Sequence, residues 1–249
     1  MPYTWPAPIG ESQKSIDDNW GCASYATTHA IESQIKVQTG KTVNISPRFL
    51  AIMSGTIPGV GNYASKVFHT ADVIGWLDAS DCPEPTGAWT NAEYYGFNIT
   101  PELLAKAKRN RMEWDVDYKL NNVTLADLDV SPLLAWVPQY TANHFVEVLD
   151  ENTRFDSYIP YVRPLGSVQK FFQFIIKRKD NMQLIKQVGT STYFLVGKKN
   201  GQRVKAGING VEYLNLMLRL TDEIGEEDLT SVPEVNVIET ASNTFVIKE

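Results

Sequence analysis

The stretch DDNWGCASYATTHAIESQI, residues 17–35, decides how the rest of the chain is interpreted. It places Cys22 directly after Trp20 and Gly21, where the pattern predicts the first turn of a helix that stops at Gly40. A thiol at a helix N-terminus ionises more readily, because the helix dipole and the free N–H groups stabilise the thiolate. Cys22 is therefore a candidate nucleophile, with a packed core thiol and one half of a disulfide as the alternatives.

A thiol nucleophile needs a nearby base, and the chain offers three histidines. His29 is nearest in sequence, but seven residues along a helix span about 10 Å, far beyond the ~3 Å of a nucleophile–base contact. His69 falls inside another predicted helix and is interpreted as structural. His144 stands at the entry to a predicted strand, and Asp156 lies twelve residues later on the next strand. A hairpin would place that carboxylate beside the imidazole, so Cys22, His144 and Asp156 form a candidate triad.

Composition excludes several classes of function. The chain has 249 residues, 43% hydrophobic and 21% charged, which is typical of a soluble globular protein. Its net charge is −6 and no basic cluster stands out, so neither nucleic acid nor a membrane is an expected partner. No apolar run approaches the ~18 residues that a membrane span needs. The start, MPYTWPAPIGESQKSIDD, lacks the features of a secretion signal, and we expect no export.

Cysteine and histidine usage predicts neither a metal site nor a cofactor. Two cysteines, Cys22 and Cys82, cannot form a disulfide framework, and a bridge between them is not required by anything in the pattern. The histidines and cysteines lack metal-ligand spacing, and no phosphate-binding glycine loop is present. The acidic stretch TDEIGEED, residues 221–228, is interpreted as a solvated loop in preference to a cation site.

The distribution of helical and strand patterns predicts an α+β fold. Ser46-Pro47 and Thr100-Pro101 are typical helix starts. The predicted helices are CASYATTHAIESQIKVQ, SPRFLAIMSG, SKVFHTADVIGWL ending at Gly75, and TPELLAKAKRNRMEW. Four strand-like runs follow: SPLLAWVPQY, HFVEVLD, TRFDSYI and KFFQFIIKR.

Beyond residue 180 the sequence predicts a small C-terminal α/β accessory domain, residues 181–249. A hairpin is expected in STYFLVGKKNGQRVKAGI, with Asn200-Gly201 at the turn. A short helix VEYLNLMLRL and a final pair of strands follow. The region carries no motif that identifies its role. It either stabilises the first domain or associates with a larger assembly.

Taken in order, several segments of residues 13–180 resemble the papain-like cysteine peptidases. WGCASYA resembles the family's Gly-Ser-Cys-Trp-Ala-Phe stretch, and NHFVEVLD resembles its histidine strand. DSY at 156–158 resembles Asn-Ser-Trp, and FFQFIIKRKD resembles the closing strand. The segment GNYASKVFHTADVIGWLDASDCPEP also resembles a family segment in its spacing. Together, the order and spacing carry the resemblance.

The resemblance implies a two-lobed fold in residues 1–180, with a helical lobe at about 20–115 and an antiparallel, barrel-like β lobe at about 116–180. It also implies that Cys22 is the nucleophile and that His144 is its partner. Asp156 replaces the usual Asn, which should raise the pKa of His144 and favour the ion pair. Cys82 replaces a family tyrosine and is expected to be a packed thiol.

The resemblance assigns further roles less directly. The family's oxyanion-binding glutamine lies six residues before the nucleophile, where this chain has Ile16. We therefore expect Gln13 to hold the oxyanion, with Asn19 as the alternative. Ala23 replaces the tryptophan that follows the nucleophile. The expected substrate-binding residues are Gly61, Asn62, Asn143 and Tyr158, and a simple turn glycine is the alternative for Gly61.

The function implied is hydrolysis of peptide bonds in a peptide or protein, through a thioester and without a cofactor. One alternative is a papain-like domain that no longer cleaves and has a structural or binding role, for example in a phage virion. Another is a peptidase that cuts peptidoglycan cross-bridges, as phage lysins do. The expected location is accordingly cytoplasmic or virion-associated.

Overall fold

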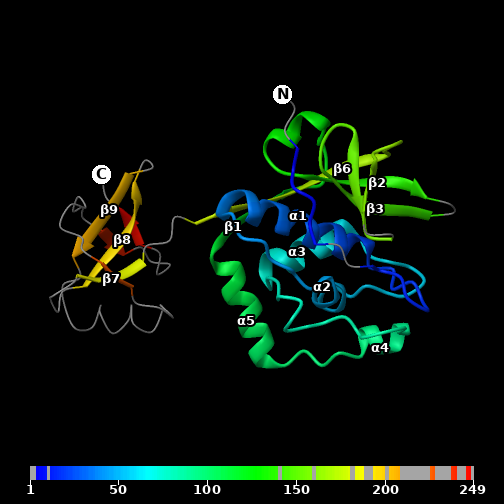
Figure 1. The fold of residues 1–249 in the computed structure, drawn as a ribbon, viewed down its shortest axis with the longest axis horizontal. Helices are drawn as coiled ribbons and strands as arrows, with labels where there is room; N and C mark the ends of the chain where they lie inside the picture. The colour runs from blue at the N-terminus through cyan, green and yellow to red at the C-terminus, as the bar shows by residue number, and fades with distance from the viewer. Residues whose placement is uncertain are drawn as a thin grey trace. The chain divides into compact units, whose positions relative to one another are not determined.

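The computed structural model describes residues 4–9, 12–139, 142–158 and 161–179, together with six strands of the C-terminal region. The chain divides into two compact units, Met1–Arg178 and Lys179–Glu249 (Figure 1). The first unit combines helices with an antiparallel sheet, in agreement with the predicted α+β class. Within the described residues, no helix is long and apolar enough to cross a bilayer.

Local sequence signals account for most of the helix boundaries. The Ser46 side chain accepts a hydrogen bond from the Phe49 N–H, and Thr100 caps its helix in the same way. Gly40 ends the first helix with φ of 73°, a backbone conformation that glycine adopts at little cost. The helices are α1 Cys22–Thr39, α2 Pro47–Met53, α3 Ala64–Val73, α4 Asn91–Tyr95, α5 Pro101–Met112 and the 3-10 helix η1 Leu125–Asp129.

The sheet of the first unit has six strands in the order β1-β6-β2-β3-β4-β5, and every described pair is antiparallel. Its strands are β1 Trp114–Lys119, β2 Leu133–Gln139, β3 Ala142–Val148, β4 Thr153–Asp156, β5 Tyr161–Pro164 and β6 Lys170–Arg178. The four runs predicted as strands are confirmed as β2, β3, β4 and β6. The prediction that the fourth helix includes Trp114 is wrong, because this residue pairs with Arg178 at the start of β1.

Helix α1 lies between the sheet and the other helices of the first unit (Figure 1). It contacts β3 and β6 on one side and α2 and α3 on the other. Its small buried residues Ala23, Ala26 and Ala30 belong to a cluster that also contains Phe68 and Phe174. Small side chains on a buried helix permit a close approach to the sheet, so the N-terminus of α1 is held in a defined position beside the strands.

Two glutamines of α1 complete the hydrogen bonding of β6. Strand β2 pairs with β6 only as far as Gln173. Beyond that point, Gln34 donates to the Phe174 carbonyl at 2.9 Å and accepts from the Ile176 N–H at 2.9 Å. Gln38 repeats the arrangement one turn later, with the Ile176 carbonyl at 2.7 Å. The helix thereby substitutes for a neighbouring strand and satisfies buried backbone groups that would otherwise destabilise the fold.

The second unit is described as strands. Strands β7 Gln183–Gln187, β8 Tyr193–Lys199, β9 Gln202–Gly207 and β10 Gly225–Glu227 form a sheet in the order β10-β7-β8-β9, and β11 Val237–Glu239 pairs with β12 Phe245–Ile247. Lys199 pairs with Gln202, which confirms that these two strands form the predicted hairpin. The predicted helix at residues 211–220 lies outside the described residues.

One prediction for the second unit is wrong. Residues Gly225–Glu227, expected to lie in an acidic loop, form β10 and pair in parallel with β7. Backbone pairing with an open strand edge can outweigh the low strand propensity of glutamate, because strand propensity depends strongly on tertiary context. The acidic composition alone was therefore a poor guide to the backbone.

Candidate active site

Two short hydrogen-bonded turns lead the chain into α1 and set the position of Cys22. The Asp18 Oδ1 accepts from the Trp20 N–H at 2.8 Å, and the Asn19 Oδ1 accepts from the Gly21 N–H at 2.8 Å. Between them, Trp20 has a φ of 60°, which is unusual for an aromatic residue and costs about 1–3 kcal/mol. Cys22 follows as the first residue of the helix and is half-buried, so its sulfur lies at the helix N-terminus as predicted.

His144 and Asp156 come together because β3 and β4 are adjacent in the sheet. The register pairs Glu147 with Phe155, so the alternation of side chains puts Asp156 on the same face as His144. The His144 Nε2 lies 2.9 Å from the Asp156 Oδ1. Both side chains are buried, at 5% and 0% exposed. With Nε2 directed to the carboxylate, Nδ1 is the ring nitrogen available to another partner.

A neighbour of His144 is Cys22, whose side chain interacts electrostatically with the His144 imidazole and helps to raise its pKa. Burial by itself lowers the pKa of His144, but the hydrogen bonds and charges of Asp156 and Cys22 outweigh it and raise this pKa to about 9. Burial also raises the pKa of Asp156, yet His144, the Tyr158 N–H and Arg154 together lower it to about 2. At neutral pH the pair is thus an imidazolium and a carboxylate.

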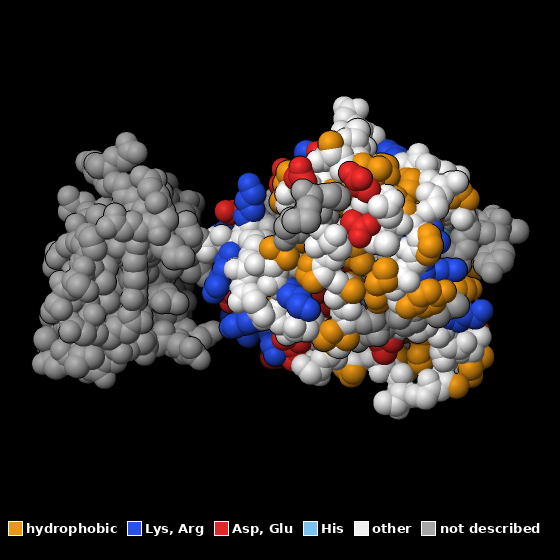
Figure 2. Space-filling model, turned by 45° about the horizontal axis from the view of Figure 1, so that its top comes forward, with side chains coloured by type: hydrophobic (Ala, Val, Ile, Leu, Met, Phe, Trp, Pro, Cys, Tyr) orange, Lys and Arg blue, Asp and Glu red, His pale blue; other side chains and the backbone are white. Residues whose placement is uncertain are grey.

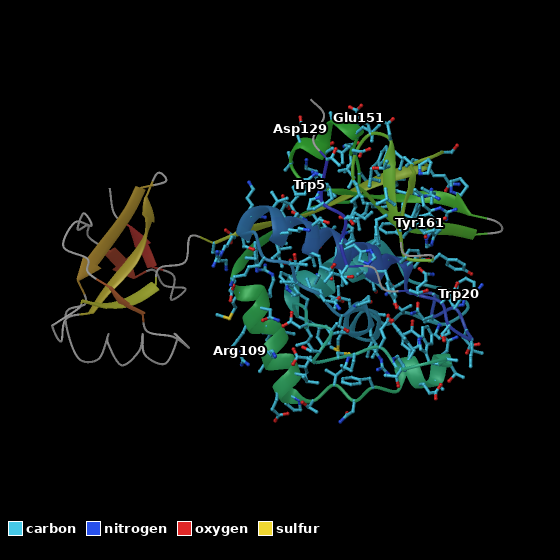
Figure 3. All side chains as sticks on the ribbon, in the orientation of Figure 1. Trp5, Trp20, Arg109, Asp129, Glu151 and Tyr161 are labelled. Carbon is cyan, nitrogen blue, oxygen red and sulfur yellow. The ribbon has the colours of Figure 1, made fainter. Side chains whose placement is uncertain are left out.

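Further groups fix the Asp156 carboxylate. Its Oδ1 also accepts from the Tyr158 N–H at 2.9 Å, and its Oδ2 accepts from Arg163 at 3.1 Å, with Arg154 at 3.7 Å. The Tyr158 ring meets the His144 ring edge to face, with the centroids 5.9 Å apart. Figure 3 shows Trp20, two residues before Cys22, and Tyr161, the cross-strand partner of Asp156, on the same side of the first unit.

Both side-chain amides predicted for the oxyanion are buried and hydrogen-bonded. Gln13 donates to the Asp18 Oδ1 at 3.2 Å and accepts from the Ser157 hydroxyl at 2.8 Å. Its backbone N–H also donates to the Ser157 carbonyl at 3.0 Å, which ties the segment before α1 to the residue after Asp156. Asn19 donates to the Tyr25 hydroxyl at 3.0 Å and is fully buried. An amide NH2 has two donors, so the bond to Asp18 leaves one on Gln13 for a further acceptor.

The loop that carries Gly61 and Asn62 is stabilised from within. Gly61 has a φ of 88° and closes a turn with Ile57, and a Cβ on it would lie 3.6 Å from the Trp20 carbonyl. The Asn62 amide donates to the Ser54 hydroxyl at 2.8 Å, so it supports its own loop. Gly61 therefore serves as a turn glycine and also lies near the segment that leads to Cys22. The side chain of Asn143 lies outside the described residues.

The remaining histidines and cysteine have other surroundings. His29 is buried between the rings of Tyr25 and Phe155, and burial lowers its pKa to about 3. His69 is exposed on α3. Cys22 and Cys82 are both free thiols, and burial raises the pKa of Cys82. Cys82 is therefore a packed core residue, as expected.

Comparison with known proteins adds distant similarity only. No protein-family model and no curated protein matches the chain. Among solved structures, it is similar to the Carica candamarcensis cysteine protease CMS1MS2 in complex with E-64, with 13% identity, 69% of this chain and 93% of that chain covered, and a TM-score of 0.45. It is also similar to the ragweed pollen cysteine protease Amb a 11 in its proform (15% identity, 70% and 64% covered, TM-score 0.47).

A third similar structure is the digestive procathepsin L 3 of the Tenebrio molitor larval midgut, with 15% identity, 82% of this chain and 61% of that chain covered, and a TM-score of 0.34. The chain thus spans less than two thirds of the two precursor structures. Similarity at this level does not assign an activity, and the function is argued below from the side chains themselves.

Arg154 and Arg163 were missed in the sequence analysis. A signal for Arg154 was present, because Arg154 and Asp156 are two residues apart in a predicted strand and must share one face. Arg163 gave no such signal, since β5 was not expected and its pairing with β4 is a long-range contact.

Proposed function

We propose that the chain is a papain-like cysteine peptidase, with Cys22 as nucleophile, His144 as general base and acid, and Asp156 as the group that orients the imidazole. The observation that carries this proposal is a buried imidazole whose Nε2 lies 2.9 Å from a buried carboxylate and whose pKa is raised in part by Cys22. The raised pKa of His144 supports an imidazolium beside the sulfur, the form that can donate a proton to a leaving amine.

The reaction proceeds in two acyl-transfer steps. The Cys22 thiolate attacks the peptide carbonyl carbon and forms a C–S bond, and the His144 imidazolium gives its proton to the departing amine nitrogen as the C–N bond breaks. In the second step His144 takes a proton from water, whose oxygen attacks the thioester carbon. The C–S bond breaks and the thiolate is restored. Asp156 stays ionised throughout and holds the ring in position.

The oxyanion of each tetrahedral intermediate is held, in this proposal, by the backbone N–H of Cys22 and the second amide donor of Gln13. The N–H groups of the first helical turn have no partner within the helix, so they suit a developing negative charge. Gln13 is favoured over Asn19 because its bonds to Ser157 tie it to the segment that carries Asp156. Loss of one such donor costs about 3–4 kcal/mol of transition-state stabilisation.

We further propose the two-lobed arrangement of the papain-like fold for residues 1–180, with 181–249 as an accessory domain. Two buried clusters are present in this unit. One contains the α1 residues with Phe68 and extends into the sheet at Phe174, and the other lies mostly in residues 116–180, with Val146 and Phe155. The substrate peptide would lie across the N-terminus of α1 between these lobes.

The proposed substrate is an extended peptide or protein segment. Gly61, Tyr158 and Asn143 remain the proposed contacts, whereas the internal hydrogen bonds of Asn62 favour a structural role for that residue. Ile57 and Val60, in the loop of Gly61, are 56% and 76% exposed. Exposed apolar side chains in this loop favour a substrate with apolar side chains. Figure 2 shows apolar side chains interspersed with charged ones on the face of the first unit that it displays.

Labelling with an epoxide thiol reagent of the E-64 type tests the proposal. We expect mass spectrometry to locate the modification on Cys22 and not on the buried Cys82, which serves as an internal control. The Cys22→Ala variant should remain unlabelled and should not cleave peptide substrates. Equal labelling of the parent chain and of Cys22→Ala, or no labelling of the parent chain, would contradict the proposal. If Cys22 is labelled but no protein substrate is cleaved, cell-wall peptides become the substrate to test, with a turbidity assay on bacterial cell walls.

A further inference from the structure

The Asp156 carboxylate is divided between two sets of partners. Its Oδ1 accepts from the His144 Nε2 and from the Tyr158 N–H, each at 2.9 Å. Its Oδ2 accepts from the Arg163 Nη1 at 3.1 Å and lies 3.7 Å from the Arg154 Nη2. The carboxylate is fully buried, so these contacts act in a medium that screens charges poorly.

The two arginines depend on that carboxylate. Arg154 and Arg163 are directly opposite each other in the β4–β5 register. Like charges at opposite positions of an antiparallel pair destabilise it. Arg154 is further fixed by a hydrogen bond from its Nη1 to the Leu165 carbonyl at 3.0 Å, and its side chain is 13% exposed. A buried anion between the two guanidinium groups offsets their repulsion, so the three residues form one charged unit.

We infer that Arg163, assisted by Arg154, is a positioning residue that holds the Asp156 Oδ2 and thereby keeps Oδ1 on the His144 imidazole while reducing the carboxylate's electrostatic effect on that ring. An aspartate in this position, without counter-charges, would bind the imidazolium too tightly for it to release a proton to the leaving amine. The catalytic consequence rests on the proposed peptidase function, whereas the effect on the His144 titration does not.

Few other charges face this unit from those neighbouring elements that the structure describes. From α1 the facing group is Cys22, and the His29 imidazole farther along that helix is held neutral by burial. From the segment before α1, the Lys14 ammonium lies 5.0 Å above the Tyr158 ring. From β5, the Tyr161 ring lies 5.2 Å from the Arg163 guanidinium. Apart from the His144 imidazolium, the two guanidinium groups are the cations of the described residues that contact the carboxylate directly.

The direction in which the pKa of His144 changes when an arginine is replaced distinguishes a positioning role from a merely structural one. Loss of one guanidinium leaves the Asp156 charge less neutralised and removes a cation from the neighbourhood of the imidazolium, and both changes raise the pKa of His144. A collapse of the local structure would instead expose His144 and lower its pKa toward the ordinary value of 6.5.

The test is an NMR titration of the histidine imidazoles in the full chain carrying Cys22→Ser, which removes the ionisable thiol from the site. With three histidines in the chain, the His144 signal is assigned by its absence from the His144→Gln variant. Arg163 is the position to change, since its side chain is 32% exposed and tolerates substitution better than Arg154. We expect Arg163→Gln to raise the His144 midpoint by roughly half a pH unit.

Two matched variants complete the experiment. Arg163→Lys keeps the charge and should restore most of the midpoint, and Arg109→Gln, an exposed site on α5 well away from Tyr161 in Figure 3, should leave it unchanged. A His144 midpoint that stays constant or falls in Arg163→Gln would overturn the inference. When Arg163→Gln is made in the chain that keeps Cys22, the alkaline limb of kcat/KM should rise by the same amount as the His144 midpoint. If no peptidase activity is found at all, that result counts against the proposed function and leaves the inference about the His144 titration intact.

Discussion

Two buried clusters of the first unit each contain a histidine and a carboxylate, yet their ionisation is opposite. In the active-site cluster, His144 has a pKa raised to about 9 and Asp156 a pKa lowered to about 2. In the core cluster between α1 and β3, burial lowers the pKa of His29 to about 3 and raises that of Glu147 to about 8. All four side chains are at least nine-tenths buried.

The difference lies in the partners and not in the burial. His144 and Asp156 satisfy each other and have Cys22, Arg154 and Arg163 as further partners. Glu147 accepts a hydrogen bond from the Ser33 hydroxyl at 2.7 Å, and its Oε2 has no partner among the described residues. A buried group without a counter-charge loses its charge, whereas a buried group with one keeps it. Within the described residues, the core cluster is thus neutral, whereas the candidate-site cluster keeps a charged histidine and a charged carboxylate.

The largest effect is expected from the sulfur of the active-site cluster. Cys22→Ala should reduce kcat/KM on a peptide substrate by about 10³-fold or more, because no other described group at the site can form the acyl intermediate. The matched change Cys82→Ala removes a thiol buried in the core and should lower the melting temperature while leaving kcat/KM within a few-fold. Comparable activity in Cys22→Ala and Cys82→Ala would show that the sulfur of Cys22 has no special role in the reaction.

Substitution of each histidine compares the clusters directly. His144→Ala should also reduce kcat/KM by roughly 10³-fold, because the thiolate loses both its counter-ion and its proton donor. His29→Leu should retain activity and keep or raise the free energy of unfolding, since a buried imidazole whose Nδ1 has no described partner is replaced by an apolar side chain. Activity assays give kcat/KM for both variants, and denaturant unfolding gives their free energies of unfolding. Loss of activity in His29→Leu without loss of folding would contradict it.

Glu147 supplies the test of the core cluster through stability. Its pKa is raised from 4.5 to about 8, so its contribution to stability is fully present below pH 4.5 and is lost as the pH rises through 8. The stability of Glu147→Gln relative to the parent chain should therefore increase with pH, by roughly 2 kcal/mol between pH 5.5 and 7.5. Urea unfolding at the two pH values measures the change.

The control for that prediction is Glu151→Gln, an exposed carboxylate in the turn that connects β3 and β4 (Figure 3). Its stability relative to the parent chain should not vary with pH in this range, because a solvated carboxylate ionises alike in the folded and unfolded states. Equal pH dependence in both variants would show that Glu147 is solvated.

The smallest effect concerns the pH range of activity. Because the His144 pKa is raised to about 9, the imidazolium persists at neutral pH, and kcat/KM should fall only above about pH 9, roughly tenfold per pH unit. The His144–Asp156 ion pair also stabilises the folded state while the imidazole is protonated. This contribution to the free energy of unfolding is fully present below pH 6.5 and is lost as the pH rises through 9. A pH profile of kcat/KM measures the limb. An alkaline limb near pH 6.5 would indicate that His144 lacks its described partners.

Local chemistry explains where sequence reasoning succeeded. Ser46-Pro47 and Thr100-Pro101 start helices because a side-chain oxygen and a proline act within one turn of chain. The hairpin at Asn200-Gly201 and the start of α1 at Cys22 follow from equally short segments. A helix α4 could also have been predicted, since Thr90 and Glu93 form a capping box.

Long-range contacts explain where sequence reasoning fell short. Trp114 follows a helical pattern without a break, and only its pairing with Arg178 makes it the start of a strand. Asn62 was interpreted by its position in a resemblance, whereas its amide is used by Ser54 in the same loop. Gln13 likewise has a partner that the sequence did not indicate, the Ser157 hydroxyl, which lies 144 residues later in the chain.

The sequence by itself determined which side chains are chemically able to form a site: a cysteine at a helix start, a histidine at a strand entry and an aspartate on the next strand. These features depend on neighbours within a few residues, which the chain specifies directly. Only the tertiary structure decided which of the buried ionisable groups stay charged. That outcome depends on whether groups distant in sequence, such as Arg163 and His144 for Asp156, lie within hydrogen-bonding distance. Those contacts decide the charge in a buried site.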